Sequence, residues 1–209
     1  MKKVKVKNIQ EALEISINYL SQIKSESNIC FTGGRFGSGL LNKIGEQRMD
    51  ISMWSIFQTD ERIECDDNEI IQNEIIHHLK DCPGYDIKNN YFFPKLSSGI
   101  KLNDYSESLR FMPNEEFDIT FLSLGEDGHL AGHFNNSILL EGNTFCYTEN
   151  APKLPKKRIS FSLERLMQSK LLVLASIGKN KKEAFNELIT GNGFHNKIMH
   201  HKGLILIHD

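Results

Sequence analysis

The sequence has no long hydrophobic run, no excess of either charge and no leader-like start. Its longest apolar stretches, residues 171–175 and 204–207, are far shorter than the roughly 20 residues that a membrane helix needs. The lysine-rich N-terminus is followed by polar residues rather than by an apolar segment, so no export signal is indicated. The 25 Lys and Arg residues nearly balance the 27 Asp and Glu residues, which gives no support for a nucleic-acid surface. We therefore expect a cytoplasmic protein that binds neither membranes nor nucleic acids.

Metal-binding, redox and nucleotide-binding motifs are missing as well. The cysteines are too far apart for a CxxC pair, since they stand at positions 30, 65, 82 and 146. His129 and His133 have the i,i+4 spacing of two zinc ligands on a helix, but no third ligand follows at a recognisable spacing. Neither the GxGxxG nor the Walker pattern occurs. We expect reduced thiols and no metal site.

What the sequence does contain is a repeated alternation of strand-like and helix-like segments. Apolar runs predict strands at residues 28–32, 53–57, 117–124, 171–177 and 204–208. Apolar spacing predicts helices at 9–25, 40–44, 69–79 and 181–189, and a short strand plus helix within 158–170. Such alternation is typical of parallel strands joined by crossover helices, and continuous apolar runs suit strands covered on both faces. The predicted fold is a single α/β domain over residues 1–209, with a doubly wound, mostly parallel, Rossmann-like sheet and helices on both faces.

Polar clusters follow several of the predicted strands, at the edge where ligands of such sheets bind. The first cluster is Thr-Gly-Gly-Arg at residues 32–35, whose glycines and following helix start can cradle a phosphate; a tight turn is the alternative. The second, Thr-Asp-Glu-Arg at 59–62, places Asp60 and Arg62 where they can hold a polar substrate or orient a base. An ion pair in a solvated turn explains the same residues.

The remaining two clusters supply a candidate base and further cations. Gly-Glu-Asp-Gly-His at residues 125–129 places His129 on a glycine-flanked loop, and an imidazole with its unperturbed pKa of ~6.5 can take a proton from water near neutral pH. A loop histidine without a role is the alternative. Basic residues fill segments 152–158 and 178–182, where they suit a phosphate, although runs of lysine are more often simply solvated.

The order of these segments resembles the 6-phosphogluconolactonase family. The matching pieces are Phe-Thr-Gly-Gly at 31–34, Trp54 and Phe57 ahead of Asp-Glu-Arg at 60–62, Leu-Gly-Glu-Asp-Gly-His at 124–129, Pro-Lys-x-Pro and Arg-Ile-Ser within 152–160, and Gly178 with Lys181. Each piece is short, but their shared order covers nearly the whole chain. The resemblance implies a cofactor-free esterase of the pentose phosphate pathway that hydrolyses 6-phosphoglucono-1,5-lactone to 6-phosphogluconate.

The resemblance also implies roles for individual residues. His129 matches the base for the attacking water, and Asp60 and Arg62 match a signature beside the sugar. The family positions that lie near the substrate's phosphate are matched by Gly33, Gly34, Arg158 and Lys181. Arg35 follows the glycine pair, as an arginine does in some family members. The expected partner is a small-molecule sugar phosphate, and the chain is expected to be a monomer or a weak homo-oligomer.

One segment also resembles the glucosamine-6-phosphate deaminase branch, whose motif runs Gly-Glu-Asp-Gly-His-Ile-Ala. That branch carries a catalytic Glu five residues after the His, where this chain has Phe134, and Asp-Glu-Tyr where this chain has Asp-Glu-Arg. The chain also departs from the lactonase pattern, with Phe36 and Gly37 in place of Thr-Pro and Glu126 in place of Pro. The lactonase branch is favoured, and a deaminase-type enzyme and a non-catalytic sugar-phosphate-binding protein are the alternatives.

Overall fold

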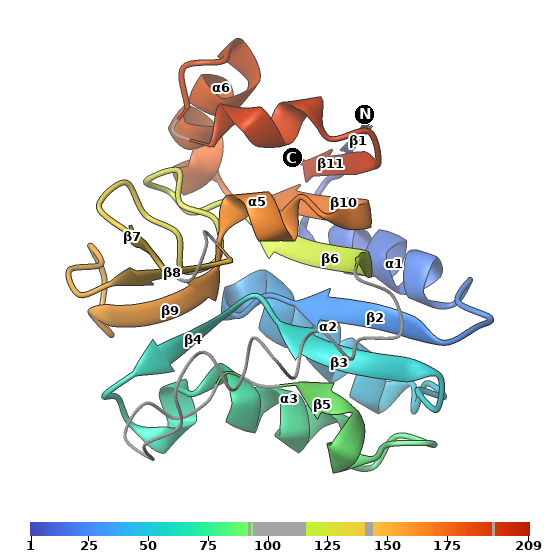
Figure 1. Cartoon of the computed structure of the whole chain (residues 1–209). Helices are drawn as coiled ribbons and strands as arrows, with labels where there is room; N and C mark the ends of the chain where they lie inside the picture. Colours follow the sequence, from blue (N-terminus) through green and yellow to red (C-terminus); the bar gives the residue numbers. More distant parts are fainter. Residues whose placement is uncertain (92, 94–115, 141–143, 194) are drawn as a thin grey trace.

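A computed structural model describes residues 1–91, 93, 116–140, 144–193 and 195–209. Within these ranges the main feature is a seven-stranded sheet in the order β1-β11-β10-β6-β2-β3-β5, and every neighbouring pair is parallel. Its strands are β1 Lys2–Lys5, β2 Ser27–Phe31, β3 Trp54–Gln58, β5 Asn90–Tyr91, β6 Phe117–Ser123, β10 Ser169–Ser176 and β11 Leu204–His208. The predicted parallel α/β sheet is confirmed, and each of the five predicted strands lies within a few residues of its expected bounds (Figure 1).

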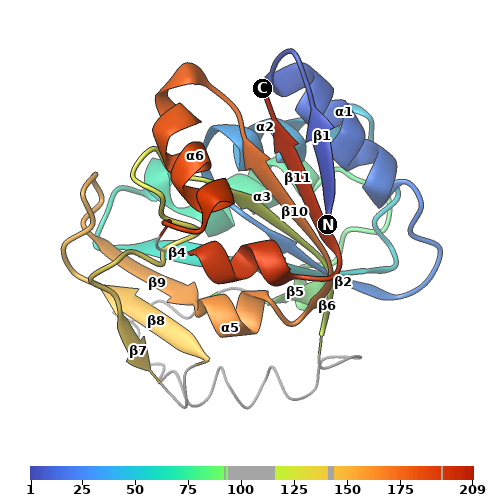
Figure 2. The same cartoon turned by 90° about the horizontal axis from the view of Figure 1, so that it is seen from above.

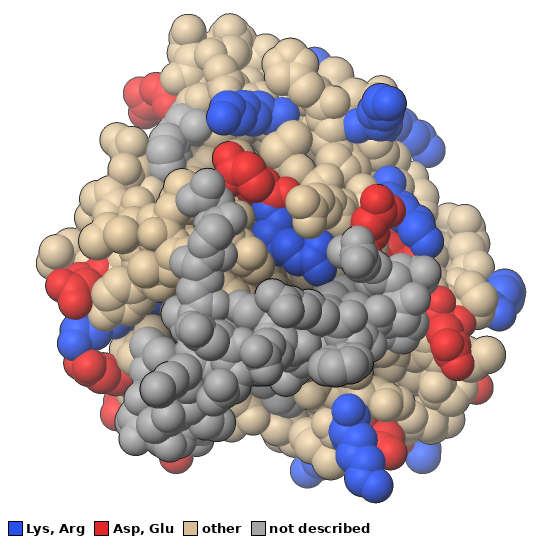
Figure 3. All heavy atoms as spheres, in the orientation of Figure 1, with Lys and Arg blue, Asp and Glu red and all other residues tan. Residues whose placement is uncertain are grey.

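Helices cover both faces of this sheet. Helices α1 (Ile9–Leu20), α2 (Gly34–Glu46) and α3 (Ile71–Leu79) pack on one face, and α5 (Leu163–Leu166) and α6 (Lys182–Thr190) pack on the other. Figure 2 shows α1 and α5 on opposite sides of the strands. Among the described residues, no helix has the length and apolar character to span a membrane. On the face seen in Figure 3, Lys and Arg side chains lie interspersed with Asp and Glu side chains.

The continuous apolar run in β10 reflects the burial of this strand on both faces of the sheet. In β10, Val173 and Ala175 join the core beneath α1 and α2, whereas Leu172 and Leu174 join the core on the opposite face. Successive side chains of a strand point to opposite faces, so a strand buried on both sides is mostly apolar, although β2 and β6 also bury Asn28 and Thr120.

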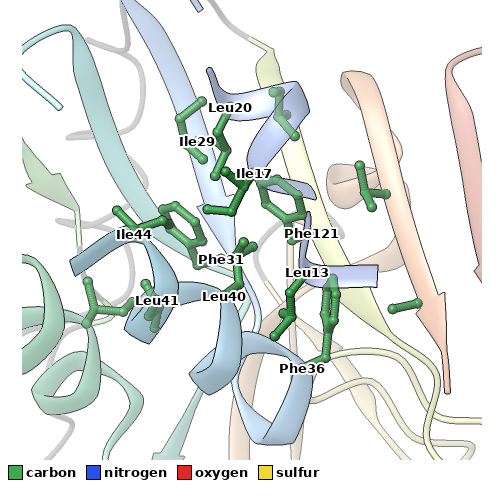
Figure 4. Close-up of a cluster of buried hydrophobic side chains, with 14 of the residues drawn as sticks. Leu13, Ile17, Leu20, Ile29, Phe31, Phe36, Leu40, Leu41, Ile44 and Phe121 are labelled. Atoms are coloured by element: carbon green, nitrogen blue, oxygen red, sulfur yellow. The ribbon is translucent and has the colours of Figure 1, made fainter. Parts of the chain in front are cut away.

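The core beneath α1 and α2 holds the main sheet to its helices (Figure 4). The rings of Phe31 from β2 and Phe121 from β6 stack with their centroids 5.8 Å apart, and Leu13, Leu40 and Ile44 of the helices pack in the same cluster. Each fully buried side chain of this kind contributes about 1.5–3 kcal/mol. This cluster fixes the position of α2, whose first turn reaches the edge where the candidate site lies.

A second sheet is present that the sequence did not predict. Strands β4 (Asp60–Ile63), β9 (Lys157–Phe161), β8 (Phe145–Thr148) and β7 (Ile138–Leu140) pair antiparallel in that order. Residues 60–62, which we expected to follow a strand as a polar cluster, are themselves part of a strand that pairs with the segment around Arg158. Because this pairing joins segments about 100 residues apart, local sequence carries no sign of it.

Helix α2 also differs from its predicted extent, since it begins at Gly34 rather than after the glycine-rich segment. Gly37 lies inside the helix, where a Cβ atom would collide with the carbonyl oxygen of Thr32. The glycine therefore permits a close approach between the helix and the end of β2, and does not mark a loop.

Candidate active site

All eight residues predicted for the site line one cavity of about 240 Å³. They come from segments far apart in the chain: Gly33, Gly34, Arg35, Asp60, Arg62, His129, Arg158 and Lys181. The cavity lies at the carboxyl ends of β2, β6 and β10, where Thr32, Leu124 and Ile177 also border it. This is the edge at which open α/β sheets bind their ligands.

The first turn of α2 forms one wall of the cavity. Gly33 is the N-cap residue and provides no side-chain hydrogen bond to the helix, and Gly34 adopts a φ of +71°. The first N–H groups of a helix have no partner within the helix, and they carry a partial positive charge. With the side chain of Arg35 beside them, these groups suit an anion.

Lys181 lies half-buried on the same side of the cavity. Its Nζ donates to Ser123 Oγ at the end of β6 over 2.8 Å. Burial, and next the positive charge of Arg35, lower the pKa of the Lys181 ammonium to about 8. An amine with this pKa is mostly protonated at neutral pH, and a bound anion would stabilise the protonated form.

Glu126 joins three segments at this part of the cavity. Its Oε1 forms an ion pair with Lys153 Nζ, and its Oε2 accepts a hydrogen bond of 2.7 Å from Asn180 Nδ2. The hydrogen bonds from Lys153 and Asn180 hold the pKa of this carboxyl below its ordinary value. All three residues line the cavity.

His129 is held by its own loop. Its Nδ1 hydrogen-bonds Asp127 Oδ1, and the imidazole stacks on Phe134 with ring centroids 4.5 Å apart. That hydrogen bond lowers the pKa of Asp127 to about 2, so the carboxylate is ionised and accepts a hydrogen bond from the Nδ1–H group. Nε2 is then the nitrogen left to accept a proton. A Cβ at Gly125 would collide with the imidazole, which explains the glycine there.

Asp60, Arg62 and Arg158 form the wall made by the antiparallel sheet. The Asp60 carboxylate is buried and accepts a hydrogen bond of 2.7 Å from Thr59 Oγ1, and its charge offsets part of the lowering of the Arg158 pKa that burial causes. The Arg158 Nε donates to the carbonyl oxygen of Pro155 over 2.9 Å. Arg62 faces Arg158 across the strand pair and donates to the carbonyl oxygen of Glu69 over 2.7 Å.

Glu61, the middle residue of the Asp-Glu-Arg segment, turns away from this wall. Its carboxylate accepts from the backbone N–H groups of Ile71 and Gln72, both at 2.9 Å, and so anchors the first turn of α3. Burial raises its pKa. Glu61 therefore supports the fold beside the site.

His133 does not pair with His129 on a helix, because residues 125–135 form turns and isolated bridges. Its ring lies against that of His195, and His195 Nε2 is 2.9 Å from the carbonyl oxygen of His133. Burial lowers the pKa of His195 to about 4. In the part of the chain that the structure describes, no three His, Cys, Asp or Glu side chains are grouped so as to hold a metal ion.

A family model described as glucosamine-6-phosphate isomerases/6-phosphogluconolactonase matches residues 2–199. The chain belongs to this family. Among curated relatives, the 6-phosphogluconolactonase of Borreliella burgdorferi is 33% identical over 104 residues, which are 49% of this chain and 44% of that protein. That of Chlamydia trachomatis is 24% identical over 171 residues, 77% of this chain and 64% of that protein. These two matches span less than two thirds of the relatives' own length.

Solved structures of the family share the fold over almost the whole chain. The 6-phosphogluconolactonase from Thermotoga maritima superposes with a TM-score of 0.81 at 18% identity, covering 99% of this chain and 98% of that one. A monomeric glucosamine-6-phosphate deaminase superposes with a TM-score of 0.77 at 17% identity, covering 100% of this chain and 97% of that one. The fold therefore does not separate the two activities.

Two residues of the site, Asp127 and Glu126, were not among the site residues predicted from the sequence. Asp127, rather than Asp60, holds the imidazole of His129, since Asp60 bonds Thr59 and, among the described residues, has no hydrogen bond to His129. The Asp-Gly-His order was a usable signal, because an Asp commonly hydrogen-bonds groups two residues on. Glu126 was noted only as a departure from the family pattern; its contacts to Lys153 and Asn180 depend on the fold.

Proposed function

We propose that this family member hydrolyses 6-phosphoglucono-1,5-lactone to 6-phosphogluconate, with His129 as general base. The observation that carries the proposal is that one cavity joins an imidazole oriented by a carboxylate to a helix N-terminus flanked by Arg35 and Lys181. A phosphorylated lactone needs both features, because one end of it carries a dianion and the other an ester carbonyl.

In the proposed reaction, water attacks the lactone carbonyl carbon while His129 Nε2 takes one of its protons. Asp127 accepts a hydrogen bond from the Nδ1–H group, which leaves Nε2 as the proton acceptor, and the carboxylate stabilises the imidazolium that forms. The tetrahedral intermediate then collapses: the bond from the former carbonyl carbon to the ring oxygen breaks, and the ring oxygen leaves with the proton from His129. The products are a carboxylic acid, which ionises, and a sugar hydroxyl.

Charge develops on the former carbonyl oxygen in this step and needs a donor. Arg62 is one candidate, since its Nε is buried and has no hydrogen-bond partner among the described residues. N–H groups of the loop that carries His129 are the other. Asp60, close enough to Arg158 to influence its pKa, is proposed to bind a sugar hydroxyl.

The phosphate is proposed to bind the backbone of Gly33 and Gly34 together with Arg35, Arg158 and Lys181. Hydrogen bonds between charged groups contribute roughly 1.5–3 kcal/mol each, so several of them give millimolar or tighter binding. We further propose that the protein acts in the cytoplasm, as a monomer or weak homo-oligomer and without a cofactor.

The test is the initial rate of hydrolysis of freshly generated 6-phosphogluconolactone, corrected for the spontaneous rate. We expect turnover by the wild type and a kcat lowered by about 10²–10⁴-fold in His129→Ala, with phosphate affinity unchanged. Gluconolactone without phosphate should be a poor substrate. Near-normal kcat in His129→Ala, or loss of activity on adding a chelator, would contradict the mechanism.

Glucosamine 6-phosphate is the control for the other branch of the family. Phe134 occupies the position of the deaminase carboxylate, and its ring covers one face of the His129 imidazole. We expect no release of ammonia from glucosamine 6-phosphate. Turnover of this compound would assign the protein to the deaminase branch instead.

A further inference from the structure

The cationic part of the cavity already contains one acidic side chain. Lysine and arginine side chains line the cavity at positions 35, 62, 153, 158 and 181, and the carboxylate of Glu126 lies among them. It is ionised at neutral pH, because Lys153 and Asn180 both donate to it. Its negative charge is also close enough to Lys181 to raise the pKa of that ammonium. Glu126 therefore engages the kinds of donor that a phosphate group would use.

Lys153 is the donor that could most readily change partner. Its side chain is 63% exposed and that of Glu126 is 36% exposed, so water screens their ion pair and keeps it weak. A phosphate dianion offers twice the charge and three acceptor oxygens, which makes it the stronger partner for an ammonium group.

We propose that Glu126 is a built-in competitor for the phosphate: it holds Lys153 when the cavity is empty, and a phosphate dianion displaces it and takes over Lys153. This inference rests on the proposed function, because it requires that the cavity binds a phosphate group. It makes Glu126 a specificity-determining residue, since a singly charged sugar carboxylate gains little by replacing a carboxylate that is already in place.

The experiment measures the affinity of inorganic phosphate by calorimetry for the wild type, Glu126→Gln, Lys153→Met and the double variant. Glutamine keeps the size of the side chain and its contact with Asn180 but removes the charge. We expect Glu126→Gln to bind phosphate up to about fivefold more tightly and Lys153→Met to bind it more weakly. In the Lys153→Met background the gain from Glu126→Gln should be much smaller, because there is no ammonium to release.

Glu64→Gln is the matched control. It breaks the similar exposed ion pair between Glu64 and Lys157, which lies outside this cavity, and should leave phosphate affinity unchanged. Unchanged or weaker binding by Glu126→Gln would overturn the inference, as would an equal gain with and without Lys153, which would show that Glu126 acts by simple repulsion. If the wild type binds no phosphate at all, the proposed phosphate site fails and this inference fails with it.

Discussion

Raising the pH from 7 to 9 should weaken the binding of a phosphate group about tenfold, through the titration of Lys181. The pKa of this ammonium is lowered to about 8 by burial and by Arg35, so the side chain loses its charge in this range. An ordinary lysine, with a pKa of ~10.4, would stay almost fully charged at pH 9.

The magnitude follows from that pKa. With a pKa of about 8, about nine tenths of Lys181 is protonated at pH 7 and about one tenth at pH 9. If only the protonated form binds, the apparent Kd rises in proportion to 1 + 10^(pH − pKa), which is about tenfold over these two pH units. A phosphate monoester has a second pKa of ~6 and is a dianion throughout, so its own charge changes little.

The assay is calorimetry with 6-phosphogluconate, because the lactone hydrolyses spontaneously. Binding at pH 9 should also take up close to one proton, which is detected by comparing buffers of different ionisation enthalpy. Lys181→Arg keeps its charge at pH 9 and should show a flat Kd, and Lys181→Met should bind weakly at every pH. A flat Kd for the wild type, or the same slope in Lys181→Arg, would refute the reasoning.

Two further predictions concern Asp127 and His195. Asp127→Ala should lower kcat about 10–100-fold while leaving phosphate affinity unchanged, because Asp127 only orients His129; a parallel loss of phosphate affinity would instead indicate a structural role. His195 should destabilise the fold in acid, since the unfolded chain takes up a proton near pH 6.5 whereas the buried imidazole does so only at about 4. Stability is thus lost as the pH falls below 6.5, by about 2 kcal/mol at pH 5. Urea unfolding at pH 7 and pH 5 measures the loss, and His195→Gln should reduce it by that amount; an unchanged loss in the variant would contradict the assignment.

The parallel sheet could be predicted because its signal is local. The central strands are rich in apolar residues, with a continuous run at Leu172–Ala175 in β10, and strands buried on both faces favour that composition. The antiparallel sheet could not be predicted, because β4 pairs with β9 across about 100 residues and Asp60 and Arg62 look like turn residues when read locally. The start of α2 was misplaced for a related reason: Gly37 is required by the Thr32 carbonyl, a contact that the order of residues does not reveal.

The sequence by itself determined the fold class and eight of the residues that meet in the cavity, because strand ends and family motifs are read along the chain. Only the tertiary structure decided which contacts each of those residues makes. Glu61 anchors a helix, Asp127 replaces Asp60 beside His129, and Glu126 lies among the cations. A side chain's partner depends on atoms brought together by packing, often from distant segments, and burial then sets the pKa on which the chemistry of Lys181 depends.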